Sequence, residues 1–239
     1  MTDPFRSQRT APAPGHSTGD FLVTVPLFSG IDRADLGRFA ELTREKSYPK
    51  GSVIVFEDDP GDSLFVVREG RVKVVLVAED GREVILGMLG IGEHFGELSL
   101  IDDQPRSAHV IAMEDATLLV LRREDFRRRV EQSPSVAWAL LVELSRRLRA
   151  ADGKIGGLVL LDVPGRIARL LLDFGEGQPG GLIEKPLTHQ TIANMIGASR
   201  ETVSRTMREF QDLGWVRVER RRIALADTDA LKKRAQVRV

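Results

Sequence analysis

The chain has 239 residues, with 35 basic and 35 acidic side chains, 42% hydrophobic residues and no cysteine. This length allows one large or two ordinary domains, and the missing cysteine excludes disulfides, Cys-ligated zinc, iron–sulfur clusters and a cysteine nucleophile. No apolar run approaches the ~20 residues that span a bilayer, and the first 20 residues lack the apolar core of a signal peptide. We therefore expect a cytoplasmic protein with no membrane partner.

The zero net charge hides two halves of opposite sign. From Pro164 onward the chain carries 14 basic and 9 acidic residues, a net charge of +5, whereas the preceding part carries 21 basic and 26 acidic residues, a net charge of −5. Halves of opposite sign fit a nucleic-acid-binding module joined to a second module, and chance scatter of charges is the alternative. The neutral total is therefore no argument against a nucleic-acid partner.

The first half begins with a polar tail and then alternates short apolar runs with turns. Residues 1–20 are rich in Pro, Ser and Thr and are expected to be a disordered tail. A short helix should follow Asp32, which is a suitable N-cap for a face formed by Leu36, Phe39, Ala40 and Leu42. Evenly spaced strands then predict an antiparallel sandwich or barrel. The six strands expected are 52–56, 64–67, 72–77, 84–89, 108–113 and 117–121.

Two helices should connect this β-rich region to the basic half, a short one over 123–132 and a long one from Pro134 to about Leu161. Apolar residues recur along the long helix at spacings of 3 and 4, which is typical of a coiled-coil seam and favours a homodimer. A helix packed on its own barrel is the alternative. Gly153, Gly156 and Gly157 should soften the far end of this helix. The seam consists of Leu141, Leu144, Leu148, Ala151, Ile155 and Leu158.

The basic half has the pattern of a helix-turn-helix. After a helix with Ile167, Leu170, Leu171 and Phe174 inward, Thr188 should cap a short helix, Gly197 should break it, and Ser199 should cap a second helix. The second helix would point Arg200, Glu201 and Arg205 outward from its start, where a recognition helix contacts base edges. An ordinary solvated face with an Arg–Glu pair is the alternative. Residues 215–218 and 223–225, around the basic segment 219–222, predict a β-hairpin wing that contacts phosphate.

A polar segment between two of the predicted strands has the composition of an anion site. A turn beginning at Gly96 would present backbone N–H groups, which bind anions. Arg106 adds a planar cation and Ser107 a hydroxyl donor suited to one phosphate, and Glu97 can accept from a sugar hydroxyl. Phosphate and ribose together indicate a nucleotide. A surface loop with an Arg–Glu salt bridge is the alternative.

Two neighbours of this segment are expected to have no chemical role. His94 should be a partly exposed loop histidine rather than a metal ligand, and Asp102-Asp103 should be a solvated loop rather than a catalytic pair. The sequence has no Walker A loop, zinc motif or Gly-x-Ser-x-Gly elbow. We therefore expect no metal site and no enzymatic activity.

Three segments resemble the Crp/Fnr family of dimeric transcription regulators, and the resemblance extends over about residues 21–225. Residues 95–100 with 106–108 resemble the family's phosphate-binding cassette, residues 199–205 the recognition helix of its cyclic-AMP-binding members, and residues 161–168 the junction between the dimer helix and the DNA domain. The resemblance implies an α+β fold with an N-terminal antiparallel β-barrel of the cyclic-nucleotide-binding type, a long dimerisation helix and a C-terminal winged helix-turn-helix. The domains would be 1–20 (tail), 21–133 (sensor), 134–162 (dimerisation helix and hinge) and 163–239 (DNA-binding).

The resemblance also implies roles for individual residues. Glu97 would bind the ribose 2′-hydroxyl, Arg106 and Ser107 the cyclic phosphate, and Arg200, Glu201 and Arg205 the G and C bases of a TGTGA-like half-site. The ligand set is Gly96, Glu97, Leu98, Ser99, Arg106, Ser107, Arg147, Ala151 and Asp152. The DNA set is Thr188, Gln190, Ser199, Arg200, Glu201, Thr202 and Arg205.

The chain also departs from the family pattern at two points. Its lack of cysteine excludes the iron–sulfur branch and disfavours the cysteine-dependent haem branch. Where cyclic-AMP-binding members place two adjacent hydroxyl residues against adenine, this chain has Ala151 and Asp152. An alanine cannot hydrogen-bond a base, whereas an aspartate accepts from an exocyclic amine or from the N1/N2 edge of guanine. These two positions leave the specificity for adenine open.

The sequence thus predicts a homodimeric DNA-binding regulator without a covalent cofactor, controlled by a cyclic nucleotide, with cyclic AMP as the first candidate. Double-stranded DNA, the nucleotide, a second copy of the chain and RNA polymerase are the expected partners. We expect the ligand to straighten residues 153–157 and set two recognition helices one DNA turn (~34 Å) apart. A ligand-independent regulator, or one that senses cyclic GMP or a cyclic dinucleotide, is the first alternative. A ligand-binding module or an enzyme with a basic tail is the second.

Overall fold

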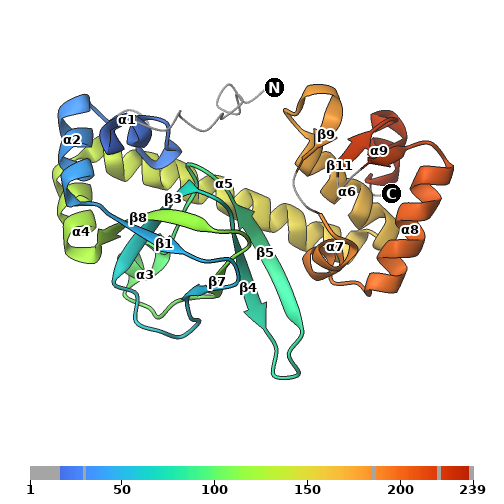
Figure 1. The fold of residues 1–239 in the computed structure, drawn as a ribbon, viewed down its shortest axis with the longest axis horizontal. Helices are drawn as coiled ribbons and strands as arrows, with labels where there is room; N and C mark the ends of the chain where they lie inside the picture. The colour runs from blue at the N-terminus through green and yellow to red at the C-terminus, as the bar shows by residue number, and fades with distance from the viewer. Residues whose placement is uncertain (1–16, 29–30, 185–186, 220–221, 237–239) are drawn as a thin grey trace. The chain divides into compact units, whose positions relative to one another are not determined.

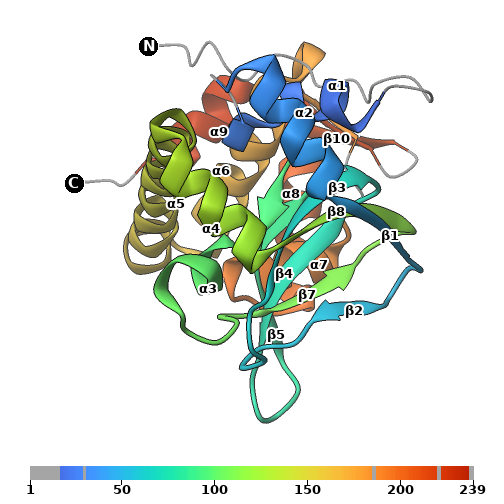
Figure 2. The ribbon, with the colours of Figure 1, turned by 90° about the vertical axis from the view of Figure 1, so that its left-hand side faces the viewer.

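The computed structural model describes residues 17–28, 31–184, 187–219 and 222–236. These residues form two compact units. Along the chain, the boundary between the units falls between Leu148 and Arg149, inside one long helix. Both units are drawn in Figure 1 and again, from another side, in Figure 2. The N-terminal unit combines two β-sheets with helices, and the C-terminal unit is mainly helical.

The N-terminal unit contains two antiparallel sheets of four strands each, so the predicted antiparallel β-structure is confirmed with eight strands in place of the six expected. Phe65, Val67, Val72, Phe95 and Val110 belong to the apolar core that the two sheets share. The first sheet has the order β1 (Arg44–Tyr48), β8 (Ala116–Arg122), β3 (Ser63–Glu69) and β6 (His94–Phe95). The second has the order β2 (Val53–Val55), β7 (His109–Ala112), β4 (Val72–Val77) and β5 (Glu83–Leu89).

Helices cover the other face of the first sheet, so its strands β3 and β8 are buried on both sides. Successive side chains of a strand point to opposite faces. Leu64 and Val66 of β3 accordingly pack under the helices, whereas Phe65 and Val67 pack between the sheets. The helices of this unit are α1 (Thr18–Val23), the 3-10 helix η1 (Pro26–Phe28), α2 (Arg33–Leu42), α3 (Glu97–Asp102), α4 (Arg123–Gln132) and the first part of α5 (Pro134–Leu160) (Figure 2).

The first helix corrects the predicted boundary of the polar tail. Residues 1–16 lie outside the described part of the chain, but Ser17 caps α1 by accepting a hydrogen bond from the Asp20 backbone N–H. Phe21 and Leu22 of this helix are fully buried in the helix-side core. The ordered chain therefore starts before residue 21, because two apolar residues anchor a helix that is only six residues long.

The long helix α5 uses one part of its apolar surface within its own unit. Val136 and Leu140 are buried in the helix-side core, and Leu144 packs partly against it. Leu144, a residue of the predicted seam, thus keeps only part of its surface exposed. The other seam residues are exposed: Leu141 (56%), Leu148 (64%), Ala151, Ile155 (60%) and Leu158 (51%). Gly153, Gly156 and Gly157 remain inside the helix.

The C-terminal unit is a winged helix-turn-helix, as predicted. Helix α6 (Val163–Gly175) starts at the N-cap Asp162 and buries Ile167, Ala168 and Leu171. Helices α7 (His189–Ile196) and α8 (Arg200–Asp212) follow, with a small sheet in the order β10 (Val216–Glu219), β11 (Arg222–Leu225) and β9 (Leu182–Ile183), and then α9 (Thr228–Arg234). Arg220 and Arg221 at the predicted wing tip lie outside the described residues.

Candidate ligand and DNA-binding sites

The predicted phosphate-binding turn is a short helix, α3 (Glu97–Asp102), that follows directly from strand β6 and Gly96. Gly96 has a φ of 87°, in the left-handed region that favours glycine. A Cβ at this position would lie 2.5 Å from Nη1 of Arg106 and 2.9 Å from the carbonyl oxygen of Ser63. Glycine is thus required here both by the backbone conformation and by the closeness of Arg106.

Arg106 is buried at the base of this turn, with 5% of its surface exposed. Its Nη1 donates to the carbonyl oxygen of Gly96 at 2.9 Å, and its Nη2 donates to that of Ser63 at 2.8 Å. Among the described residues the nearest carboxylate oxygen is Oδ1 of Asp62, at 3.9 Å, on a side chain that is 89% exposed. Burial lowers the pKa of the Arg106 guanidinium, yet an arginine in a protein keeps its charge. The site therefore holds a cation without a close counter-ion, which suits an anionic ligand.

Glu97 is also buried, with 2% exposure, and only one of its carboxylate oxygens has a partner. Oε1 accepts from Nη1 of Arg147 at 2.8 Å, whereas Oε2 is buried and accepts no hydrogen bond within the described structure. Burial raises the pKa of Glu97, and the neighbouring Arg147 opposes that shift. A buried acceptor without a partner is costly. A ligand hydroxyl that donates to Oε2 would satisfy it.

His94 and Arg147 lie next to each other on one side of this site. His94 is 1% exposed and lies on strand β6, so the expectation of a partly exposed loop histidine is wrong. Nη2 of Arg147 donates to the His94 carbonyl oxygen at 2.7 Å and lies 3.3 Å from its Nε2. Burial, together with the charge of Arg147, holds the pKa of His94 well below its usual value. Both residues of β6 are buried, and a strand of two residues has no alternation by which the sequence could reveal it.

A neutral, buried His94 predicts a pH-dependent free energy of unfolding. The unfolded chain takes up a proton near pH 6.5, whereas the folded chain does not, so the full stability is present above pH 6.5 and is lost as the pH falls. The loss is at most ~1.4 kcal/mol per pH unit. Melting temperatures of the wild type between pH 7.5 and 5.5 should fall more steeply than those of His94→Gln, which cannot titrate. Parallel curves for the two proteins would contradict this account.

The structure brings together five of the predicted ligand residues, which are mostly buried. Gly96, Glu97, Ser99, Arg106 and Arg147 lie around α3, although the Ser99 hydroxyl already donates to the Pro105 carbonyl oxygen at 3.3 Å. The remaining four are exposed. They are Leu98 on α3, Ser107 after it, and Ala151 and Asp152 on the part of α5 that belongs to the C-terminal unit.

Arg106 also borders a cavity of about 340 Å³ in the N-terminal unit. Apolar side chains such as Ile54, Phe65 and Val120 line it together with Lys46. Neither Gly96 nor Glu97 is among its lining residues. Of the residues of the predicted phosphate-binding cassette, Arg106 is therefore the one that borders this cavity.

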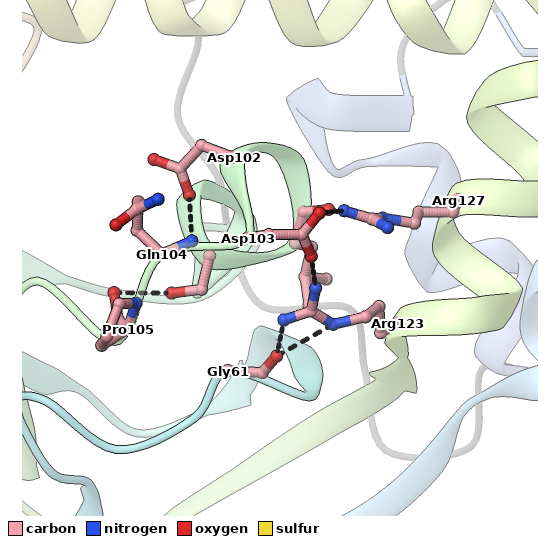
Figure 3. A network of polar contacts seen from close by, with 9 residues as sticks. Gly61, Asp102, Asp103, Gln104, Pro105, Arg123 and Arg127 are labelled. Carbon is pink, nitrogen blue, oxygen red and sulfur yellow. Dashed lines mark hydrogen bonds and ion pairs between the residues drawn. The ribbon is translucent and has the colours of Figure 1, made fainter.

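The acidic pair at the end of α3 is more than the solvated loop that the sequence suggested. Asp102 Oδ1 accepts from the Gln104 backbone N–H at 3.0 Å, as in an ordinary turn. Asp103, in contrast, ends the helix with a φ of 60° and binds both Arg123 and Arg127 of helix α4 (Figure 3). The guanidinium groups also hold the pKa of Asp103 below its usual value. Figure 3 shows Asp103 between the two arginines, with Asp102 pointing away from them.

The predicted recognition helix has the caps and the faces that its sequence indicates. Thr188 accepts from the Thr191 backbone N–H at 3.0 Å, Gly197 ends α7 with a φ of 64°, and Ser199 accepts from the Thr202 backbone N–H at 3.1 Å. Val203, Met207 and Phe210 are buried, which fixes the opposite face toward solvent. Arg200, Glu201 and Arg205 are exposed there, and no ion pair is described for any of them. The backbone N–H and the Ser199 hydroxyl, with a smaller contribution from the charge of Arg200, lower the pKa of Glu201.

Two further side chains connect the start of α7 to its surroundings. Nδ1 of His189 lies 3.0 Å from the Ser204 hydroxyl, which joins α7 to the recognition helix α8. Gln190, a predicted DNA contact, donates to Oδ1 of Asn194 at 2.7 Å and is exposed.

The described helices include none long and apolar enough to cross a membrane. The described His, Asp and Glu residues form no group of three that could hold a metal ion.

Comparisons with known proteins agree with both halves of this architecture. The chain matches the cyclic nucleotide-binding domain over residues 45–133 and the Crp-like helix-turn-helix domain over residues 165–234. It is 32% identical to the CRP-like cAMP-activated global transcriptional regulator of Mycobacterium tuberculosis over 222 residues, which cover 91% of this chain and 99% of that protein. It is 36% identical to the cyclic AMP receptor protein of Thermus thermophilus over 193 residues, covering 81% and 88%.

A solved structure extends the comparison to a regulator of another ligand class. The c-di-GMP responsive global regulator CLP of Xanthomonas campestris is similar with a TM-score of 0.69 and 27% identity, over 81% of this chain and 99% of that one. Both domains are thus matched in order, and sequence identity extends over nearly the full length of the mycobacterial regulator. The chain belongs to the Crp/Fnr family of DNA-binding transcription regulators.

Proposed function

We propose that this regulator is controlled by a cyclic nucleotide that binds at helix α3. The observation that carries the proposal is the pair of incomplete buried groups there. Among the described residues, Arg106 has as its counter-ion only the exposed Asp62 at 3.9 Å, and Oε2 of Glu97 accepts no hydrogen bond. A cyclic phosphate would take the charge of Arg106 and the exposed hydroxyl of Ser107. The ribose 2′-hydroxyl would donate to Glu97. One ligand would thus supply both an anion for Arg106 and a hydrogen-bond donor for Glu97.

Cyclic AMP is the first candidate for this ligand, since relatives 32–36% identical carry its name. Ala151 and Asp152, at the positions assigned to the base, favour a second candidate as well. An acceptor-only side chain suits the N1/N2 edge of guanine, and the similar Xanthomonas regulator is named for a guanine dinucleotide. Cyclic GMP and cyclic di-GMP are therefore the alternative effectors.

The proposed DNA site is a TGTGA-like palindrome bound by a homodimer in the cytoplasm, with RNA polymerase as a further partner. The exposed Arg200, Glu201 and Arg205 would contact base edges in the major groove. Support for the dimer comes from the apolar side chains that α5 leaves exposed, which include Leu141, Leu148, Ile155 and Leu158. Sedimentation equilibrium measures this assembly directly.

The experiment that tests the function is DNA binding with and without each effector. Fluorescence anisotropy on a TGTGA palindrome and on a scrambled duplex, with cyclic AMP, cyclic GMP or cyclic di-GMP, gives the ligand dependence and the specificity in one series. We expect one nucleotide to raise affinity for the palindrome alone. Equal affinity for both duplexes under every condition would contradict the proposed DNA site. A response to none of the effectors would contradict the proposed ligand.

The glycines of α5 give a test of how the ligand acts. A Cβ at Gly156 meets nothing within 4 Å, and one at Gly157 meets only Leu161, at 4.0 Å, so alanine fits at both positions. Each Gly→Ala change favours the straight helix by ~1 kcal/mol. If straightening activates the protein, each change should raise the DNA affinity of the ligand-free form roughly fivefold.

The control for the glycine substitutions is Gly37→Ala on helix α2, where a Cβ also meets nothing within 4 Å. This change should stabilise its own helix without altering ligand dependence. Anisotropy without nucleotide gives the comparison. If Gly156→Ala and Gly157→Ala leave the ligand dependence unaltered, the hinge mechanism is wrong.

A further inference from the structure

The end of helix α3 is held in an unfavourable backbone conformation by two arginines of helix α4 (Figure 3). Asp103 has a φ of 60°, which costs free energy in a residue with a Cβ. Its carboxylate accepts from Nη1 of Arg123 through Oδ1 and from Nη2 of Arg127 through Oδ2, the latter at 2.7 Å. Such a conformation persists only where its surroundings fix it. These two contacts supply that constraint.

The same two arginines also bind the backbone on both sides of the nucleotide site. Nε of Arg127 donates to the carbonyl oxygen of Leu100, inside α3, at 2.8 Å. Nε of Arg123 donates to the carbonyl oxygen of Gly61 at 3.0 Å, and its backbone N–H donates to that of Asp62 at 2.8 Å. The first two turns of α4 therefore connect α3 to the segment 61–63.

Segment 61–63 in turn sets the position of Arg106. The Ser63 carbonyl oxygen accepts from Nη2 of Arg106, and a Cβ at Gly61 would lie 3.3 Å from Cζ of Arg106. The same Cβ would lie only 2.3 Å from Cβ of Ser99 on α3. Backbone and helix are thus in close contact here, so a shift of either one moves the guanidinium that the phosphate would need.

We propose that Asp103, Arg123 and Arg127 form a positioning clamp for the nucleotide site. The clamp fixes α3 and segment 61–63 relative to each other, and this fixes the place of Arg106 without any contact between the clamp and the ligand. Preorganisation of this kind strengthens binding because the site does not have to be ordered when the ligand arrives. The inference rests on the proposed function of the cassette.

The test uses a matched pair of neighbouring substitutions in the full-length chain. Asp103→Asn removes the charge that both arginines bind but keeps a residue type that tolerates a positive φ. Asp102→Asn is the control, because the hydrogen bond described for the Asp102 carboxylate comes from the Gln104 backbone, and no ion pair with an arginine is described for it. Calorimetry with the nucleotide that the wild type binds should show roughly tenfold weaker binding for Asp103→Asn, the value of one charge-assisted hydrogen bond. Asp102→Asn should stay within twofold of the wild type.

Two further variants separate positioning from a general loss of stability. Asp103→Gly relieves the backbone strain, so its melting temperature should not fall below that of Asp103→Asn, yet its nucleotide affinity should be just as weak. The double variant Asp103→Asn/Arg127→Gln should lose less affinity than its two single changes lose together, because both of them break the contact between Asp103 and Arg127.

The outcomes distinguish this inference from the function on which it rests. A wild type that binds a nucleotide while Asp103→Asn binds it within twofold of Asp102→Asn would overturn the clamp alone. Affinity losses that follow melting temperature across all four variants would also overturn it. A wild type that binds none of the nucleotides would overturn the proposed function and the role of the clamp together.

Discussion

Replacing Arg106 by alanine should weaken nucleotide binding more than about a hundredfold, a loss of at least ~2.7 kcal/mol. The change removes the buried cation that a cyclic phosphate would neutralise, and charge-assisted hydrogen bonds to a phosphate contribute ~1.5–3 kcal/mol each. Calorimetry with cyclic AMP, cyclic GMP and cyclic di-GMP measures the effect. Nucleotide-stimulated DNA binding should be lost with it, whereas the DNA affinity of the ligand-free form should not change.

Arg106 also holds the Gly96 and Ser63 carbonyls, so its removal needs two controls. Arg106→Lys keeps the charge but not the fork, and it should retain part of the affinity. Arg82→Ala removes an exposed arginine from the β4–β5 turn, where the described structure pairs it with Asp80, and this variant should bind like the wild type. Melting temperatures show whether each variant is folded. Binding by folded Arg106→Ala within threefold of the wild type would refute the cassette.

Arg200→Ala should weaken binding to the TGTGA palindrome by ~1–3 kcal/mol and relax the preference at a single guanine. The side chain is exposed at the first turn of α8, where an arginine fork matches the O6 and N7 atoms of guanine. Because no described ion pair involves Arg200, alanine should leave the fold intact. Anisotropy on the palindrome and on duplexes that vary one base pair at a time measures both effects.

The control for Arg200→Ala is Lys232→Ala, which removes an exposed cation on helix α9. Loss of a charge that only attracts phosphate weakens binding to every sequence alike. A base contact instead weakens the palindrome more than the scrambled duplex. Equal losses on the two duplexes for Arg200→Ala would contradict its role in reading a base.

Local sequence determined most of the secondary structure. The helix 123–132 was predicted with its observed bounds, and the caps Asp32, Thr188 and Ser199 all accept the expected backbone hydrogen bond. Capping depends on residues three positions apart, so a sequence pattern is enough to reveal it. Strands β1 and β6 were missed. The side chains of β1 are mostly exposed and show no apolar alternation, and β6 has only two residues.

The candidate sites divide in the same way. The sequence could indicate the ligand site because four of its residues lie within a segment of twelve: Gly96, Glu97, Arg106 and Ser107. It could indicate the DNA site because the exposed residues of α8 recur with the period of a helix. Tertiary structure alone decided the long-range contacts. Arg147 reaches Glu97 from 50 residues away.

Burial was also decided by the tertiary structure. It buries His94, which stays neutral, and packs Leu144 partly against the core of its own unit. It also places Asp103 in contact with helix α4. Local periodicity specifies which way a side chain points along its own element. Its partner and its solvation depend on what the rest of the chain packs against that element.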